Sequence, residues 1–190
     1  QRHASILKKK FKFKKIFILT KRRIKGFLVI KNILEIRKLN IDYIIISSPT
    51  FNHFKHLKFI EKNLKYKKIL VEKPLFEKFR NLKIKKNKVF VGYNLRFHPL
   101  IKYVKKNFSN KKIIDIKILC NSYLPNWRKN INYTMSSSAH KSQGGGVILD
   151  LSHELDYVRW LFGEVSLKFT EKGKFSKLSI NTEDHLKLYG

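Results

Sequence analysis

The segment Val71-Glu72-Lys73-Pro74 carries the first residues that could take part in a reaction. Its last three residues directly follow the short, almost wholly apolar run 68–71, whose composition is typical of a buried strand. In open α/β sheets, ligands bind beyond the carboxyl ends of the strands, so this charged pair would be well placed to meet one. A lysine there can donate to a substrate hydroxyl, or act as an acid or base if its pKa is lowered. The alternative interpretation is a solvated turn.

A second candidate group follows three consecutive glycines, residues 144–146. Glycines allow the backbone to approach a ligand closely. Beyond them, Asp150 and His153 are three residues apart on a predicted helix and should share a face, with Glu154 also next to Asp150. A carboxylate beside an imidazole fixes its tautomer and raises its basicity, which suits proton transfer from an alcohol. A structural Asp–His pair is the alternative.

Short apolar runs and helical patterns alternate in the first half of the chain, which is typical of βαβ units on a parallel sheet. Strands are predicted at residues 15–20, 42–47, 68–71 and 88–93, and helices at 54–64, 97–108 and 151–162. In the second half we expect a strand at 112–119, a long functional loop at 121–146, and antiparallel strands at 165–171, 175–180 and 185–189.

Composition narrows the class of protein. The 190 residues include one cysteine, Cys120, so no internal disulfide can form, and no Cys/His spacing indicates a metal site. No run approaches the roughly 20 apolar residues of a membrane span, and no signal peptide is evident, which favours a cytoplasmic protein without membrane contact. The net charge of +30 is mostly lysine, and we interpret it as solvated surface. A nucleic-acid binder stays the remote alternative, because base-stacking and groove-reading elements are missing.

Four motifs in order resemble the glucose-fructose oxidoreductase / inositol 2-dehydrogenase (Gfo/Idh/MocA) family of NAD(P)-dependent sugar oxidoreductases. The motifs are Ile44–Thr50 with His53, Val71–Pro74, Gly92–Phe97, and Gly144–Asp156. The first residues, Gln1-Arg2-His3, are similar to those that follow the glycine-rich phosphate loop of the family.

The resemblance implies an α/β fold in two parts. Residues 1–95 would form a Rossmann-like, doubly wound parallel sheet that binds the dinucleotide, without its first strand and glycine loop. Residues 96–190 would form the start of an α+β open-sheet domain for substrate binding and oligomerisation. Both domains are expected to be incomplete, and the full-length protein is expected to be a homo-oligomer through its C-terminal sheet.

The resemblance also assigns roles. Lys73 would lie between nicotinamide and substrate, with Glu72 near the cofactor ribose, and His153 would be the acid/base that acts on the substrate together with Asp150. Further cofactor contacts are expected from Ser48, Pro49, Thr50, His53 and Asn94, and further substrate contacts from Arg96, Trp127, Arg128 and His140. The motif Asp150–His153 is one residue shorter than in many members of the family, which leaves the role of Asp150 open.

The cofactor is NAD or NADP. Arg22 follows the strand predicted at 15–20, where NAD-specific enzymes usually carry an acidic residue, and an arginine there can accept a 2′-phosphate, which favours NADP. Without a glycine-rich loop, these residues alone should bind a dinucleotide poorly.

The loop 123–140 resembles that of family members of surface-polysaccharide and sialic-acid-like sugar pathways. Trp127 could stack on a sugar ring and Arg128 could bind a carboxylate or phosphate, although a tryptophan that anchors the loop is an equal alternative. The function predicted is hydride transfer between nicotinamide and a carbon of a sugar or nucleotide sugar, in bacterial surface-carbohydrate synthesis. The alternative is a truncated, non-catalytic binding module of the same fold.

Overall fold

The computed structural model describes residues 2–11, 15–108 and 110–190. Gln1, which was compared above with the residues that follow the glycine-rich loop of the family, lies outside the described residues. The chain divides into two compact units, one up to Asp42 and one from Tyr43 onward. The domain boundary predicted at residue 95 stays a prediction.

The first unit contains α1 (Arg2–Lys10), β1 (Phe17–Leu19), β2 (Leu28–Ile30) and a 3₁₀ helix, η1 (Ile33–Lys38). The strands β1 and β2 pair in parallel. The strand predicted at 15–20 is confirmed in a shorter form. The strand β2 was not predicted, because three residues between a glycine-containing turn and a helix are too few to show a repeating hydrophobic pattern. A capping box opens η1: the Leu34 amide donates to Asn32, and the Glu35 carboxylate accepts from the Asn32 amide.

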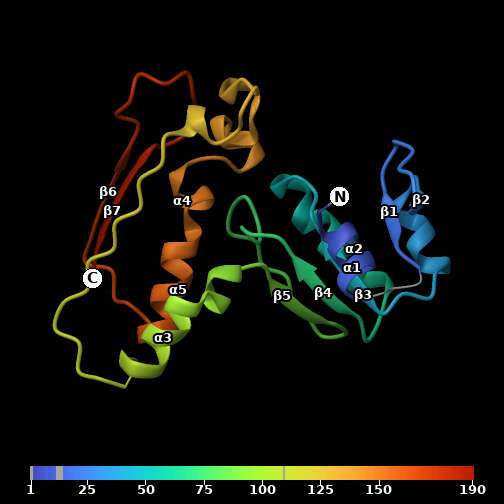
Figure 1. The fold of residues 1–190 in the computed structure, drawn as a ribbon, viewed down its shortest axis with the longest axis horizontal. Helices are drawn as coiled ribbons and strands as arrows, with labels where there is room; N and C mark the ends of the chain where they lie inside the picture. Colours follow the sequence, from blue (N-terminus) through green and yellow to red (C-terminus); the bar gives the residue numbers. More distant parts are fainter. Residues whose placement is uncertain (1, 12–14, 109) are drawn as a thin grey trace. The chain divides into compact units, whose positions relative to one another are not determined.

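The second unit begins with a parallel sheet of β3 (Tyr43–Ile46), β4 (Lys68–Val71) and β5 (Lys88–Val91), in the order β3-β4-β5. All three strands and the parallel pairing were predicted from their short apolar runs, and the prediction is confirmed. Helix α2 (His53–Asn63) connects β3 to β4 and buries Leu57 and Ile60 (Figure 1). In the central strand, Ile69 has an exposed fraction of 0%.

The register of this sheet aligns the carboxyl ends of its strands. Ile46 pairs with Val71, and Val71 pairs with Val91. The ladder continues for one more bond on each side, since the Glu72 amide donates to the Ile46 carbonyl at 2.9 Å and the Gly92 amide donates to the Val71 carbonyl at 2.8 Å. The residues that follow these strands therefore meet at one edge, where ligands of such sheets bind.

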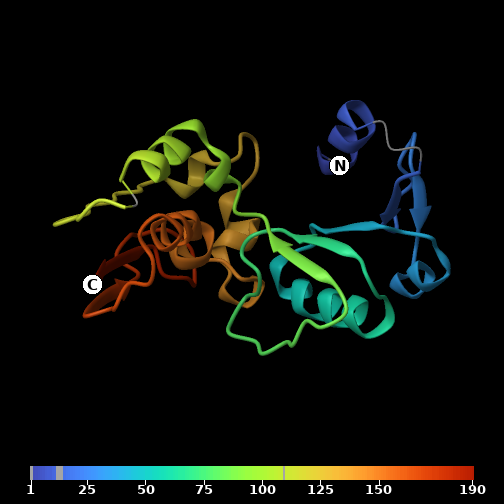
Figure 2. The ribbon, with the colours of Figure 1, turned by 90° about the horizontal axis from the view of Figure 1, so that it is seen from below.

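The rest of the second unit is more irregular. After the 3₁₀ turn η3 (Asn94–Phe97) come α3 (Pro99–Phe108), the short α4 (Val147–Asp150), α5 (Ser152–Phe162), and the antiparallel strands β6 (Phe169–Gly173) and β7 (His185–Tyr189). The predicted helices at 97–108 and 151–162 are confirmed with small shifts of their starts, and Gly163 ends α5 with φ +93°. Figure 2 shows α3, α5 and the β6–β7 ribbon from a second side.

Between α3 and α4 the described chain has no regular strand, only short 3₁₀ turns: η4 (Leu124–Asn126), η5 (Tyr133–Met135), η6 (Ser137–Ala139) and η7 (Lys141–Gln143). The predicted strand at 112–119 is thus wrong, because these extended residues have no neighbouring strand to pair with. The predicted strand at 175–180 is also wrong. It is part of a long connection between β6 and β7, and the strand predicted from residue 165 forms only from Phe169.

In the part of the chain that the structure describes, no helix is both long enough and apolar enough to cross a bilayer.

Candidate active site

Lys73 lies two residues after Val71, which ends β4 and has an exposed fraction of 0%. The peptide bond between Lys73 and Pro74 is cis. The Lys73 ammonium donates a hydrogen bond to the backbone carbonyl of Asp150. The structure therefore brings together two segments that are far apart in the sequence, as the predicted catalytic centre requires.

Asp150 ends α4, and its carboxyl group is surrounded by donors. The Ser138 hydroxyl and the Gly146 amide both hydrogen-bond to it, and the positive charges of Lys73 and Arg128 face it. Burial raises the pKa of Asp150 above its ordinary value, and these four groups oppose that rise without cancelling it. The carboxyl group is thus held in a fixed, partly dehydrated position.

His153 lies one turn further, on α5. Burial and, after it, the charge of Lys73 lower the pKa of His153, while Glu154, Asp156 and Glu72 oppose the shift. The ring contacts Tyr93 edge-on, with 5.7 Å between ring centroids, and the buried Nδ1 atom has no hydrogen-bond partner. A neutral imidazole with a buried, unpaired nitrogen can accept or share a proton with a bound group.

The expected pairing of Asp150 with His153 is not formed. The prediction assumed one continuous helix, but Leu151 separates α4 from α5 with φ −102° and ψ +28°. The hydrogen-bond donors to the Asp150 carboxyl are Ser138 and Gly146, and His153 faces Lys73 and Glu72. The two side chains therefore act on the same region from separate positions.

The glycine triplet serves the protein's own packing. A Cβ atom at Gly145 would lie 2.3 Å from the Ser137 carbonyl oxygen, a distance no side chain tolerates. At Gly146, with φ +110°, it would lie 2.3 Å from a carboxylate oxygen of Glu183. The expectation that these glycines admit a ligand is corrected: they admit neighbouring protein atoms.

The turn after β3 contains the predicted cofactor contacts Ser48, Pro49 and Thr50. The Ser48 hydroxyl pairs with Nδ1 of His56 at 3.0 Å, Pro49 is exposed, and the Thr50 side chain lies where a Cβ atom of Gly144 would be 3.1 Å away. Burial, followed by the charges of His53 and Lys55, lowers the pKa of His56. Ser48 and Pro49 thus border the carboxyl edge of the sheet, while Thr50 packs against the glycine triplet.

His53 has a structural position. Its exposed fraction is 1%, its Nε2 lies 2.8 Å from the Ser48 carbonyl, and its Nδ1 lies 3.1 Å from the Pro74 carbonyl. Both ring nitrogens are therefore occupied by backbone oxygens, and any effect of His53 on a cofactor would be indirect. It ties the turn after β3 to the turn after β4.

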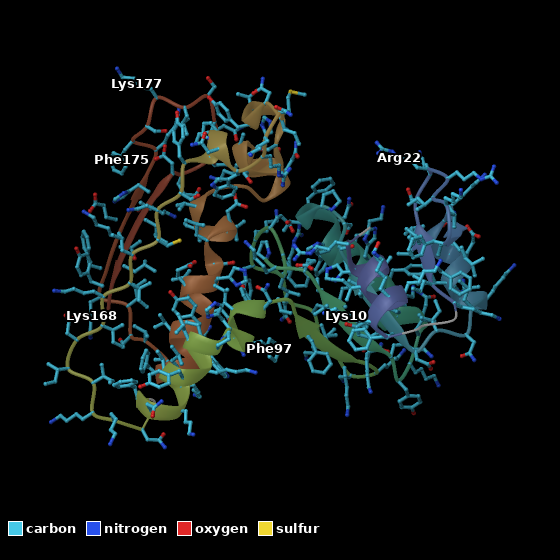
Figure 3. The ribbon with its side chains drawn as sticks, in the orientation of Figure 1. Lys10, Arg22, Phe97, Lys168, Phe175 and Lys177 are labelled. Carbon is cyan, nitrogen blue, oxygen red and sulfur yellow. The ribbon has the colours of Figure 1, made fainter. Side chains whose placement is uncertain are left out.

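Glu72 lies against Gly92, at which a Cβ atom would be 3.2 Å from Glu72 Oε2. Asn94, also predicted to contact the cofactor, begins η3 and is exposed. Arg22 lies in the other compact unit, after β1, where its amide donates to the Thr20 hydroxyl at 3.2 Å. Figure 3 marks Arg22 on the β1–β2 connection. The cofactor roles of these residues stay predictions.

Arg96, predicted to contact the substrate, forms a two-pronged ion pair with Asp156 of α5 instead. Its Nε donates to Asp156 Oδ2 at 2.7 Å, and its NH2 group donates to Oδ1. The bond to Asp156 raises the pKa of Arg96. Asp156 is three residues after His153, so this pair fixes the helix that carries His153 to the turn after β5.

The predicted substrate loop forms a groove. It is lined by Leu124, Pro125, Trp127, Arg128, Ile131, Tyr133, Ser136 and Ser138. The Trp127 indole donates to Ser122 at 2.5 Å, which anchors the ring, and His140 is held by the Thr134 carbonyl at 2.7 Å. Arg128 is exposed and makes no side-chain hydrogen bond among the described residues, so its guanidinium is available to an anion.

Sequence reasoning missed Ser138, Asp156 and Tyr93. Only Asp156 carried a usable signal, because residues three apart on a helix share a face and His153 was already singled out. Among the described residues, no three metal-ligating side chains gather at one point.

Comparisons with known proteins give the same class of fold. No family model matches the chain. An uncharacterized oxidoreductase from Synechocystis sp. is 28% identical over 131 residues, which are 65% of this chain, and the chain spans only about a third (35%) of that curated relative.

Two solved structures of WlbA dehydrogenases share the fold. The enzyme from Thermus thermophilus, in complex with NAD and α-ketoglutarate, is 16% identical with a TM-score of 0.67, over 96% of this chain and 67% of its own. The enzyme from Bordetella pertussis, in complex with NADH and UDP-GlcNAcA, is 16% identical with a TM-score of 0.62, over 84% of this chain and 51% of its own. The chain therefore has the Rossmann-like α/β fold of NAD-binding dehydrogenases, as predicted.

Proposed function

We propose that this chain is part of an NAD(P)-dependent oxidoreductase that acts on a hydroxyl or keto carbon of a sugar or nucleotide sugar. The observation that carries the proposal is the meeting of Lys73 with Asp150, at the carboxyl edge of the sheet, beside His153 with its buried, unpaired Nδ1. A proton donor, a buried carboxyl and a neutral imidazole at one place are what alcohol oxidation or ketone reduction needs.

The polar residues at this edge fit a nicotinamide cofactor: Ser48, Glu72 and Asn94 follow β3, β4 and β5 and offer both hydrogen-bond donors and acceptors. When bound, the nicotinamide supplies or accepts the hydride. The chain's own residues handle the proton. The ammonium of Lys73 donates to the substrate oxygen and orients it, and the imidazole of His153 takes up or returns the hydroxyl proton. Asp150 holds Lys73 through its carbonyl, and its carboxyl acts on the substrate together with His153.

The substrate class is supported by the groove beside Asp150. At its surface, the exposed guanidinium of Arg128 would contact an anionic group and the partly exposed indole of Trp127 would contact a sugar ring, and a neighbour of the same fold was solved with UDP-GlcNAcA. Arg22 supports NADP through its position after β1. We further propose a cytoplasmic role in surface-carbohydrate synthesis and a homo-oligomer that forms through β6 and β7, whose Phe169, Leu188 and Tyr189 are exposed.

The test is to measure dinucleotide binding by calorimetry and nicotinamide absorbance with a panel of nucleotide sugars, using the full-length protein. Lys73→Met and His153→Gln should each lower kcat by about 10²- to 10⁴-fold, the range for loss of a group that transfers a proton. Lys78→Met, which removes an exposed lysine close by, should leave kcat unchanged. If no sugar is turned over and both variants bind ligands as the unaltered protein does, the non-catalytic binding module is favoured.

A further inference from the structure

The connection between β6 and β7 packs against the segment that surrounds Asp150. Figure 3 marks Phe175 and Lys177 at the start of this connection, which ends at β7. The Ser179 amide donates to the Tyr133 hydroxyl at 3.1 Å, and the Asn181 amide donates to the Ala139 carbonyl at 3.0 Å. The connection that includes the strand predicted at 175–180 is thus attached by hydrogen bonds to the loop that contains Tyr133 and Ala139.

Two residues of this connection reach the groups that hold the Asp150 carboxyl. Thr182, with an exposed fraction of 4%, donates its hydroxyl to the Ser138 carbonyl at 3.3 Å. Glu183 lies over Gly146, and its backbone carbonyl accepts from the Val147 amide at 3.0 Å. Ser138 and Gly146 are the two hydrogen-bond donors to the Asp150 carboxyl.

We propose that Thr182 and Glu183 are positioning residues for Asp150: Thr182 holds the backbone of Ser138, and Glu183 holds Gly146 and the start of α4, the helix that Asp150 ends. This inference rests on the proposed function, because Asp150 matters to a reaction only if the site is catalytic. Glu183 acts through packing and backbone bonds, since the charges that face the Asp150 carboxyl are those of Lys73 and Arg128.

The position of Gly146 shows why Glu183 is suited to this role. With φ +110° and no Cβ atom, Gly146 lets the carboxylate lie directly on its backbone, and the Ile148 amide donates to the same carboxylate at 3.4 Å. A shorter side chain at 183 would leave a gap over the residue whose amide holds Asp150. A glutamine fills the same space and keeps an oxygen that can accept from Ile148.

The experiment is a ¹³C NMR titration of the Asp150 carboxyl in the full-length protein, with the pH profile of turnover measured alongside. Thr182→Val and Glu183→Ala should each raise the pKa of Asp150 by about one unit, because a weakened hydrogen bond of about 1 kcal/mol no longer favours the ionised form. Thr182→Ser and Glu183→Gln should restore the original value. Thr170→Val, on exposed β6, is the matched control.

The KM for the dinucleotide should stay unchanged in all variants, whereas the acid limb of the kcat profile should move with the titration. An unchanged Asp150 titration in both Thr182→Val and Glu183→Ala would overturn the proposal, as would a shifted titration with an unmoved kcat profile. If Thr182→Val fails to fold, the pair Glu183→Ala and Glu183→Gln decides. If the Asp150 titration shifts in the variants but the protein turns over no sugar, the proposed function is refuted while the positioning of Asp150 by Thr182 and Glu183 is supported.

Discussion

The two sides of the candidate site are built differently. Lys73 follows a central strand whose Ile69 and Val71 are fully buried and paired to a neighbouring strand on both sides. Asp150 ends a helix of four residues, and its donors come from a loop and a glycine. The first side is rigid because of the sheet, while the second is held by hydrogen bonds that join distant segments, such as Thr182 to Ser138.

This difference indicates which interactions stabilise the sheet that carries Lys73 and which stabilise the loop around Asp150. Loss of an apolar side chain in the sheet removes buried surface and leaves a cavity, so it should unfold the unit as a whole. Loss of a single contact on the loop side should leave the sheet intact and change only the local geometry. Variants on each side therefore test the comparison directly.

The largest effect is expected in the sheet. Ile69→Ala should lower the free energy of unfolding by about 2 to 5 kcal/mol, the range for truncating a fully buried isoleucine. Ile131→Ala, a half-exposed isoleucine of the groove loop, should change it by less than about 0.5 kcal/mol. Urea denaturation of both variants measures the contrast, and equal losses would contradict it.

An intermediate effect is expected at the carboxylate that joins α2 to the turn before β5. Glu61 is buried and accepts from the amides of Lys85 and Lys86, each at 2.8 Å, and from Asn87 at 2.7 Å. Burial alone would raise the pKa of Glu61, but these bonds outweigh it and the pKa is lowered. Glu61→Gln should cost about 2 kcal/mol at neutral pH, because a glutamine places an N–H group against other donors.

The pH dependence of the stability lost in Glu61→Gln follows from the direction of the Glu61 pKa shift, which is downward. A carboxyl whose pKa is lowered by folding stabilises the folded state above its unfolded pKa, and this contribution is lost as the pH falls through the folded pKa. The difference between the unaltered protein and Glu61→Gln should therefore shrink on acidification. Glu164→Gln, at an exposed carboxylate, serves as the control. A difference that grows toward low pH would refute the assignment.

The smallest effect on stability is expected in the groove. Arg128→Met should change the free energy of unfolding by less than about 0.5 kcal/mol, because the guanidinium makes no hydrogen bond in the described chain. It should nevertheless raise the KM for an anionic sugar substrate about tenfold, and leave that for a neutral sugar unchanged. Lys129→Met, at the exposed neighbouring cation, is the matched control. A KM that rises equally for both substrates would count against an anion contact.

The sheet side was predictable because its signals are local. Short, almost wholly apolar runs such as 68–71 indicate strands in the sequence, and parallel pairing follows from the helix between them. The loop side was only partly predictable. Asp150 and His153 were found by type and spacing, but their separation by Leu151 and the role of Ser138 depend on contacts with residues such as Thr182, which spacing does not encode. The absence of a strand at 112–119 likewise depends on which neighbours are present.

Lys73 binds the backbone oxygen of Asp150, and this choice of atom has an experimental consequence. Every amino acid supplies that carbonyl, so replacement of the side chain at position 150 leaves the anchor of the lysine in place. A replacement at position 150 therefore removes the carboxyl from the site while the ammonium stays where it is. The contributions of the two groups to turnover can thus be separated with a single variant.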